Sequence, residues 1–358
     1  MELKALLKSL SEACGVSGYE DEVRELVRAT YEPMVDEVRT DAMGNLIALK
    51  RGTDIVDGAR RSILLAAHMD EIGLMVTEID DGFVRFTQVG GYDARILPAQ
   101  PVVVFGRKRL SGVIGSVPPH VSGGGDSATP MHKLYVDLGL PAADVEKLVR
   151  TGDLITLDRK CVELTDDLLC GKAFDDRAAI AAVAVCLDVL TRTMHEWDVY
   201  AVATVQEEVG LRGATTGAFG VAPDVGIAID VGFGKQPGVA EHVYIELDKG
   251  PALTMGPNVH PKLFDAIKDT AEDTEIPIQI EVCAGGTGTD ANAIQLTRDG
   301  IPTALLSIAE RNMHTPVETI SIKDVTRTGR LLAAFITKLD SEFMDKLSFV
   351  QTTTGGKK

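Results

Sequence analysis

The sequence predicts an α/β protein in which a mostly parallel, doubly covered sheet is interrupted by an inserted β-rich domain. From Gly171 onward, apolar strand-like runs alternate with helical segments, which is the pattern of a parallel sheet with helices on both faces. Between Gly73 and about Leu164, short strands and turns dominate instead. The chain has 358 residues, which is enough for two domains and a large core.

The first part of the chain predicts two helices followed by three strands. Apolar residues at helical spacing mark the helices: Leu3, Leu6, Leu7 and Leu10, then Val23, Leu26, Val27 and Tyr31. Strands are expected at 37–40, 46–49 and 62–67, and the last of these is apolar throughout, as in a buried strand. The β-rich part contains a hairpin pattern at 75–86. Its glycine-rich stretch at 122–127 lacks the ending of a phosphate loop and is interpreted as a flexible linker.

The second half of the chain predicts the alternating elements of the main sheet. Helices are expected at 177–191, about 261–273, about 291–298 and 324–340, and strands at 199–205, 225–230, 276–282 and 303–308. The polar tail at 351–358 is expected to be disordered.

Composition and charge exclude several classes of protein. With 36 basic and 53 acidic residues the net charge is −17, the wrong sign for a nucleic-acid or anionic-membrane partner. The five cysteines are scattered and never in a CxxC spacing, so a reducing cytoplasm is expected rather than a disulfide framework. The N-terminal residues lack a signal-peptide core, and the longest apolar run, 178–187, is far below the roughly 18 residues of a membrane span.

Residues that can bind metal ions follow the predicted strands. Active sites of open α/β sheets gather at the carboxyl ends of the strands. His68 and Asp70 come directly after the strand at 62–67, and at strand spacing their side chains project to the same side. A ligating imidazole commonly donates its other N–H to a carboxylate. His68 is therefore a candidate ligand and Asp70 its orienting partner, although such a pair by itself often only caps a sheet.

Two acidic pairs repeat this pattern. Asp175 and Asp176 precede a predicted helix, where they could equally serve as the helix cap and first-turn charge. Glu207 and Glu208 follow a predicted strand. Two adjacent carboxylates at a buried strand end repel each other unless cations neutralise them or one of them binds a proton.

Two further segments complete a set of metal-binding side chains. Asp230 ends an apolar run, and His314 follows the strand at 303–308. Five separate segments thus supply imidazoles and carboxylates without thiolates. This set is typical of a site for two divalent ions such as Zn²⁺, Co²⁺ or Mn²⁺.

The motifs around these residues resemble those of the M42 family of metallo-aminopeptidases, the group of glutamyl and tetrahedral aminopeptidases. They occur in family order over nearly the whole chain: HMD at 68–70, GKAFDDR at 171–177, EEVG at 207–210, IDV at 229–231, GTDANAI at 288–294 and MHTPVE at 313–318. The sequence pattern predicts a catalytic domain at about 1–70 and 165–350, which the resemblance implies is zinc-peptidase-like, and a β-rich insert at about 71–164. The resemblance also implies that the insert at 71–164 serves dimerisation and assembly, and that homododecamers built from dimers enclose the active sites.

The resemblance also implies the ligand set, residue by residue. It makes Asp175 the carboxylate that bridges two metal ions. His68 and Asp230 complete one metal site, and Glu208 and His314 complete the other.

The resemblance assigns the proton chemistry as well. Glu207 becomes the general base, which takes a proton from water and passes it to the leaving amine. Asp70 matches the supporting acid, and a cis peptide bond is implied between Asp175 and Asp176. The metal ions would lower the pKa of water to about 7 and polarise the scissile carbonyl. The expected activity is removal of N-terminal residues from short peptides with a free N-terminus.

Three other functions fit parts of the pattern less well. A glycosidase needs two carboxylates about 5–9.5 Å apart on either side of the bond, which adjacent Glu207 and Glu208 do not readily provide. A metal-dependent carboxypeptidase or deacylase would share the ligands but hold a substrate carboxylate through a basic residue. A non-catalytic scaffold would lack a ligand or Glu207. The sequence leaves open which N-terminal side chain is preferred and which metal is used.

Overall fold

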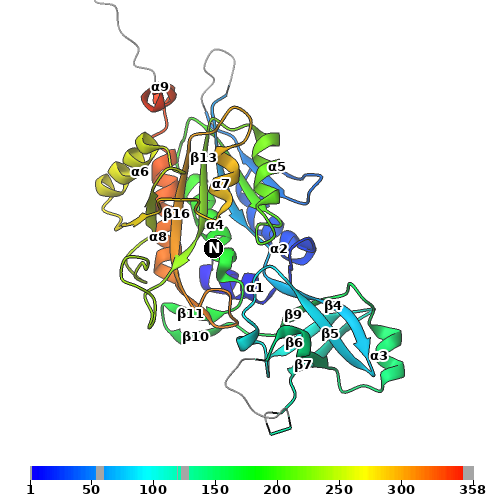
Figure 1. Ribbon diagram of the computed structural model, residues 1–358. Helices are drawn as coiled ribbons and strands as arrows, with labels where there is room; N and C mark the ends of the chain where they lie inside the picture. Colours follow the sequence, from blue (N-terminus) through cyan, green and yellow to red (C-terminus); the bar gives the residue numbers. More distant parts are fainter. Residues whose placement is uncertain (1, 54–59, 119, 122–128, 350–358) are drawn as a thin grey trace, which may run out of the picture.

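The computed structural model describes residues 2–53, 60–118, 120–121 and 129–349. Its strands form a large mixed sheet and a separate small barrel (Figure 1). The predicted linker at 122–127 and the predicted disordered tail at 351–358 lie outside the described residues. Within the described residues, no helix has the length and apolar character needed to cross a membrane.

The large sheet has a parallel centre and mostly antiparallel margins. Its order is β1 (Glu37–Thr40), β2 (Leu46–Lys50), β12 (Asp198–Thr204), β3 (Ser62–His68), β13 (Val225–Phe233), β16 (Thr303–Arg311), β17 (Glu318–Ser321), β11 (Leu168–Gly171) and β10 (Val162–Thr165). In addition, β14 (Ala252–Met255) pairs with β16, and β15 (Gln279–Val282) pairs with β14. Strands β12, β3, β13 and β16 run parallel to one another.

The prediction of a mostly parallel sheet is therefore wrong outside this centre. Strands β1 and β2, β10 and β11, and β16 and β17 are antiparallel neighbours. Each of these pairs is joined by a short connection, which can only reverse the direction of the chain, whereas a parallel pair needs a long crossover.

Helices cover both faces of the large sheet (Figure 1). Helices α4 (Phe174–Leu190) and α8 (Ile322–Ile336) pack against each other on one face, together with α1 (Leu3–Glu12). Helices α5 (Arg212–Val221) and α7 (Asp290–Gln295) lie on the other face. The remaining helices of this body are α2 (Asp21–Tyr31), α6 (Pro261–Asp273) and α9 (Phe343–Leu347). Helix α4 is buried almost all round, which explains its Ala- and Val-rich sequence.

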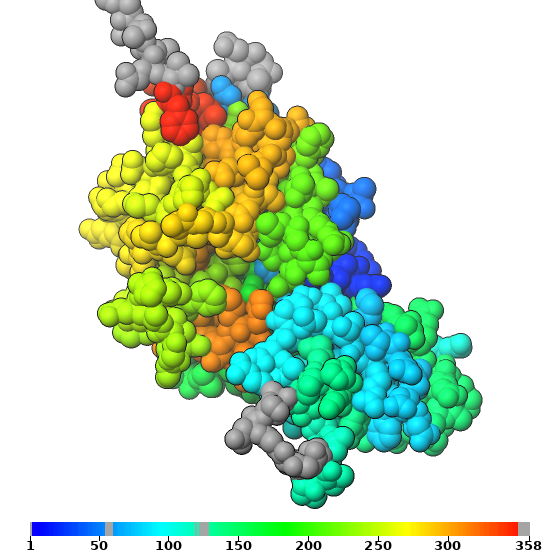
Figure 2. Space-filling view, viewed as in Figure 1, coloured from blue at the N-terminus to red at the C-terminus, as the bar shows by residue number. Residues whose placement is uncertain are grey.

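The second sheet is a closed antiparallel barrel. Its order is β4 (Gly73–Asp80), β5 (Phe83–Val89), β8 (Tyr135–Asp137), β7 (Arg109–Gly115), β6 (Pro101–Phe105) and β9 (Leu154–Leu157). The predicted hairpin at 75–86 is confirmed: Asp81 and Gly82 both have positive φ, as the tight turn between β4 and β5 requires. The barrel has its own apolar core, carries α3 (Ala142–Leu148), and protrudes from the body (Figures 1 and 2).

Candidate active site

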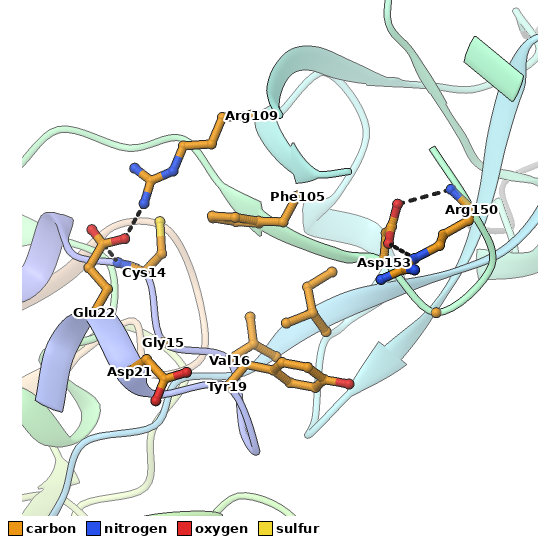
Figure 3. Close-up of a pocket in the computed structure, with 12 residues that line it drawn as sticks. Cys14, Gly15, Val16, Tyr19, Asp21, Glu22, Phe105, Arg109, Arg150 and Asp153 are labelled. Atoms are coloured by element: carbon orange, nitrogen blue, oxygen red, sulfur yellow. Dashed lines mark hydrogen bonds and ion pairs between the residues drawn. The ribbon is translucent and has the colours of Figure 1, made fainter. Parts of the chain in front are cut away.

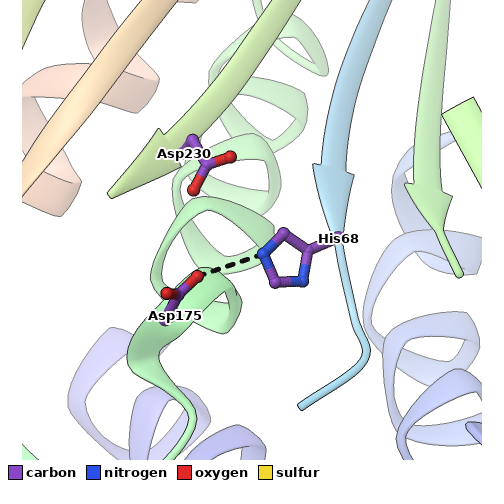
Figure 4. Close-up of side chains that lie close together, drawn as sticks. All are labelled: His68, Asp175 and Asp230. Carbon is purple, nitrogen blue, oxygen red and sulfur yellow. Dashed lines mark hydrogen bonds and ion pairs between the residues drawn. The ribbon is translucent and has the colours of Figure 1, made fainter. Parts of the chain in front are cut away.

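Neighbouring parallel strands bring the candidate residues to one edge of the large sheet. His68 is the last residue of β3, Asp230 lies near the end of β13, and the loop after β12 carries Glu207 and Glu208. Figure 4 shows His68 and Asp230 on adjacent strands, with Asp175 close to His68 at the start of α4. The carboxyl ends of the parallel strands are thus where the predicted residues gather.

Asp175 lies between two imidazoles. Its Oδ1 atom is 3.1 Å from Nε2 of His68, and its Oδ2 atom is 3.2 Å from Nε2 of His314. The His314 nitrogen is also 3.4 Å from Oε1 of Glu208. The possible ligand atoms form two groups, and the atoms of each group all lie within 4.8 Å of one another. One group contains His68, Asp175 and Asp230. The other contains Asp175, Glu208 and His314, so Asp175 belongs to both. The structure therefore brings together all five predicted ligands.

The peptide bond between Asp175 and Asp176 is cis, as the resemblance implies. The side chain of Asp176 is buried, and its Oδ2 accepts a hydrogen bond of 3.2 Å from the backbone N–H of His68. Asp176 thus lies behind the cluster and contacts the main chain of a predicted ligand.

Asp70 connects His68 to the loop that carries the two glutamates. Its Oδ1 is 3.5 Å from Nδ1 of His68 and accepts a hydrogen bond of 3.0 Å from the backbone N–H of Glu207. Its Oδ2 accepts from the backbone N–H of Glu208 at 3.2 Å and from the hydroxyl of Ser17 at 2.6 Å. Asp70 is fully buried, so it holds both the imidazole and this loop in place. The sequence analysis did not identify Ser17 as a hydrogen-bond partner of Asp70.

The cluster carries an excess of buried negative charge. Burial, together with the nearby charge of Asp230, raises the pKa of Glu207 to about 10, although His68 offsets part of the effect. Burial and Asp175 raise the pKa of Glu208 to about 7. The pKa of Asp230 is also raised, mainly by burial. Such shifts indicate that the site lacks positive charge, which bound divalent cations would supply.

Asp175 and His314 shift for a different reason, because each of them pairs with a group of opposite charge. Burial disfavours the charged form of Asp175, but hydrogen bonds from His314 and His68 outweigh it and lower the pKa of this carboxyl. The hydrogen bond to Asp175 raises the pKa of His314 to about 9.

A second set of buried charged side chains lies beside the cluster, and the sequence analysis did not predict it. Glu71 Oε2 is 2.6 Å from Nζ of Lys172, and Glu71 Oε1 is 3.4 Å from the guanidinium of Arg177. All three side chains are buried. Lys172 and Arg177 belong to a motif quoted above, but nothing in the sequence identifies Glu71 as their partner. Asp290, in another quoted motif, is also buried, and its Oδ2 accepts a hydrogen bond of 2.5 Å from Thr204.

The cluster opens into a pocket of about 250 Å³. Beyond the metal-binding candidates, its lining includes Thr254, Glu281 and Ser307 from neighbouring strands. A cavity of about 320 Å³ lies elsewhere, between the N-terminal segment and the barrel (Figure 3). In that cavity Arg109 pairs with Glu22 and Arg150 with Asp153, and none of the predicted site residues lines it.

The fold and this cluster define an α/β protein with a candidate two-metal site at the carboxyl ends of its parallel strands. The model of the M42 glutamyl aminopeptidase family matches residues 44–331, and the chain belongs to this family of peptide hydrolases. The sequence-based identification of the family is therefore confirmed.

Known relatives match the chain over nearly its full length. The lysyl aminopeptidase of Pyrococcus furiosus is 38% identical over 345 residues, which cover 93% of this chain and 96% of that protein. The aminopeptidase APDkam598 from the archaeon Desulfurococcus kamchatkensis has a TM-score of 0.91 at 38% identity, covering 98% of this chain and 99% of its own. The TET1 peptidase of Pyrococcus horikoshii, which can assemble into a tetrahedron or a large octahedral shell, has a TM-score of 0.83 at 33% identity. The match covers 94% of this chain and 100% of the TET1 chain.

Proposed function

We propose that this aminopeptidase depends on two divalent metal ions and removes N-terminal residues from short peptides with a free N-terminus. His68 and Asp230 would hold one ion and Glu208 and His314 the other, with Asp175 shared between them. The observation that carries the proposal is the position of Asp175, whose two carboxylate oxygens face different imidazoles at 3.1 and 3.2 Å.

The donor set fits divalent ions. Imidazole nitrogens and carboxylate oxygens suit Zn²⁺, Co²⁺ or Mn²⁺. The lining of the described pocket contains no lysine or arginine that could neutralise its carboxylates. When bound, such ions lower the pKa of water and polarise a carbonyl group.

Glu207 is the group best placed to move a proton. It lines the pocket but belongs to neither group of possible ligands, and its Oε2 is 4.0 Å from Nε2 of His68. We assign it the role of general base, which requires that bound cations lower its pKa from the value of about 10 in the ion-free cluster. It takes a proton from the water that adds to the scissile carbonyl carbon, and it gives this proton to the amine nitrogen as the C–N bond breaks. Asp70 positions Glu207 and His68 for this step through the contacts described above.

We also propose that the chain assembles into a homododecamer built from dimers. Residues 1–70 and 165–350 would form the catalytic domain, and 71–164 the assembly domain. The extensive similarity to a TET1 peptidase that forms closed shells supports this. Light scattering of the purified protein should give the mass of about twelve chains, and a purely dimeric species would contradict the proposal.

The five free cysteines support a reducing cytoplasm as the location.

The activity is tested with a peptide mixture that contains each sequence in free and N-acetylated form. Chelated protein is compared by mass spectrometry with protein resupplied with Zn²⁺, Co²⁺ or Mn²⁺. Stepwise loss of N-terminal residues from the free peptides alone, restored by metal, is expected. Trimming from the carboxyl end, or removal of the acetyl group, would leave the metal site but refute the substrate assignment, and complete inertness would favour a scaffold.

Two substitutions separate the proposed roles. Glu207→Gln should keep both metal ions but lose most turnover, because the amide cannot accept the proton. His314→Ala should lose one metal ion per chain, as measured by elemental analysis. His242→Ala is the matched control, since His242 is exposed and belongs to neither ligand group. Unchanged turnover in Glu207→Gln would remove Glu207 as the base.

A further inference from the structure

We infer that this enzyme prefers peptides whose N-terminal residue is basic, and that Glu281 recognises the lysine or arginine side chain. The inference rests on the proposed function, because it takes the cluster around Asp175 as the catalytic centre. It concerns the part of the same pocket that lies beyond the candidate metal ligands.

The hydrogen bonds of Glu281 hold its carboxylate close to the cluster. Glu281 lies on β15 beside Thr254 of β14, and its Oε2 accepts hydrogen bonds of 3.0 Å from the hydroxyls of Thr254 and Ser307. Ser307 in turn is the direct neighbour of Asp230 in the pairing of β16 with β13. The carboxylate therefore extends from an outer strand to the strand beside Asp230, one of the candidate ligands.

The other oxygen of Glu281 lies near Gly232 of β13. A Cβ atom built on Gly232 would lie 3.7 Å from Oε1 of Glu281, behind closer contacts with Ile245 at 3.0 Å and Ser307 at 3.1 Å. Gly232 is two residues beyond Asp230 on β13, so both project to the same face, about 6.6 Å apart along the strand. A lysine side chain spans a comparable distance with its four-carbon stem. A substrate whose N-terminus lies at the cluster could therefore place its ammonium group at Glu281.

The charge of the pocket favours a basic side chain. In the described pocket the lining has no lysine or arginine, and Glu281 is the one carboxylate outside the proposed metal and proton chemistry. Its two hydrogen-bond partners are neutral hydroxyls, so its negative charge is available to a ligand. In the cavity of Figure 3, by contrast, acidic side chains are paired with arginines.

Apolar groups complete the recognition surface. Phe233 and Leu305 line the same pocket and can pack against the stem of a lysine or arginine while Glu281 binds the charged end. An acidic N-terminal side chain would be repelled by Glu281, and a leucine would leave this carboxylate without a positively charged partner.

The test compares kcat/KM for tripeptides that differ only in an N-terminal Lys, Arg, Leu or Glu. Wild-type protein should prefer Lys and Arg to Leu by about tenfold or more, the effect of one hydrogen bond to a charged group. Glu281→Gln keeps the size and an acceptor oxygen, and it should lower the Lys-to-Leu ratio about tenfold, mainly through KM. Glu281→Lys should favour Glu over Lys. The matched control is Glu272→Gln, on the exposed surface of α6, which should leave all ratios unchanged.

A measurement on the unaltered protein does not depend on the folding of these variants. Cadaverine, with an ammonium group at each end, should inhibit cleavage of the Leu peptide about tenfold more tightly than pentylamine does. Equal inhibition by the two amines, or an unchanged Lys-to-Leu ratio in folded Glu281→Gln, would overturn the inference. If wild-type protein trims all four peptides equally, the inference alone falls. If it trims none of them, the proposed function falls as well.

Discussion

Replacement of Glu71 by alanine should destabilise the protein strongly, because it leaves two buried cations without their counter-charge. Glu71 is 2% exposed, and its partners Lys172 and Arg177 are 4% and 0% exposed. Glu71 also accepts a hydrogen bond of 3.0 Å from the backbone N–H of Gly15. Removal of one partner from a buried ion pair costs about 3–5 kcal/mol. An exposed pair contributes only about 0–1 kcal/mol.

The effect should depend on pH in a defined direction. Burial disfavours ionised Glu71, but Lys172 and Arg177 outweigh it, so the pKa of this carboxyl is lowered below 4.5 in the folded protein. A lowered folded-state pKa contributes stability above the unfolded pKa, and this stability is lost as the pH falls through the folded pKa. The difference in stability between wild type and Glu71→Gln should therefore be complete at neutral pH and shrink below about pH 4.5.

Urea unfolding followed by tryptophan fluorescence measures this effect. Trp197 is the only tryptophan of the chain, is 1% exposed, and packs edge-on against Phe343 at 5.9 Å between ring centres. Its emission therefore reports unfolding of the body. The control Asp188→Ala breaks an exposed pair with Arg192. If Glu71→Ala loses no more free energy of unfolding than this control at neutral pH, the reasoning about the buried charges is refuted.

Four further perturbations test other parts of the structure. Asp70→Asn should lower kcat about 10–100-fold, because it weakens the contacts that orient His68 and the glutamate loop; an unchanged kcat would contradict this role. Gly329→Ala should cost about 1–3 kcal/mol in urea unfolding, since its Cβ would lie 2.4 Å from the carbonyl oxygen of Ala182 on α4. Gly220→Ala, in α5 with open space around the new Cβ, should instead raise the free energy of unfolding by up to about 1 kcal/mol. If both glycine variants change the free energy of unfolding in the same direction, this reasoning is refuted. Removal of divalent ions with a chelator should lower the Tm, because the carboxylates of the cluster repel one another without the ions. Addition of Zn²⁺ or Co²⁺ should restore the Tm, and a constant Tm would contradict a metal centre.

The parts of the fold that sequence could predict are those with strong periodicity. The predicted helices at 177–191, 261–273 and 324–340 correspond to α4, α6 and α8. Helix α5 was missed because its ten residues, RGATTGAFGV, include three glycines and two threonines, which favour helix poorly. Its packing against α7 and β12 supplies what the local sequence lacks. The short strands β14 and β17 were also missed, and both are held in place by antiparallel pairing with β16.

Some residues of the candidate site could likewise be predicted from the sequence, and others could not. Residues at the ends of central strands could be predicted, because the edge to which a parallel strand delivers its last side chains follows from topology. The partners of Asp70 could not, since Ser17 is 53 positions away in the chain and two further contacts use backbone N–H groups. Glu281 could not be placed either. Its position beside the cluster depends on β14, whose antiparallel pairing with β16 leaves no mark in the sequence.

The ion pair between Glu71 and Lys172 joins the point at which the chain leaves the large sheet for the barrel to the residue that follows β11, the second strand after the chain has returned. The segments that carry His68 and Asp175 are therefore held together inside the body and not through the barrel. A different module could replace the barrel without moving either residue. In this sense the chain is modular. The shape and surface of the protruding part could change while the residues at the sheet edge keep their positions.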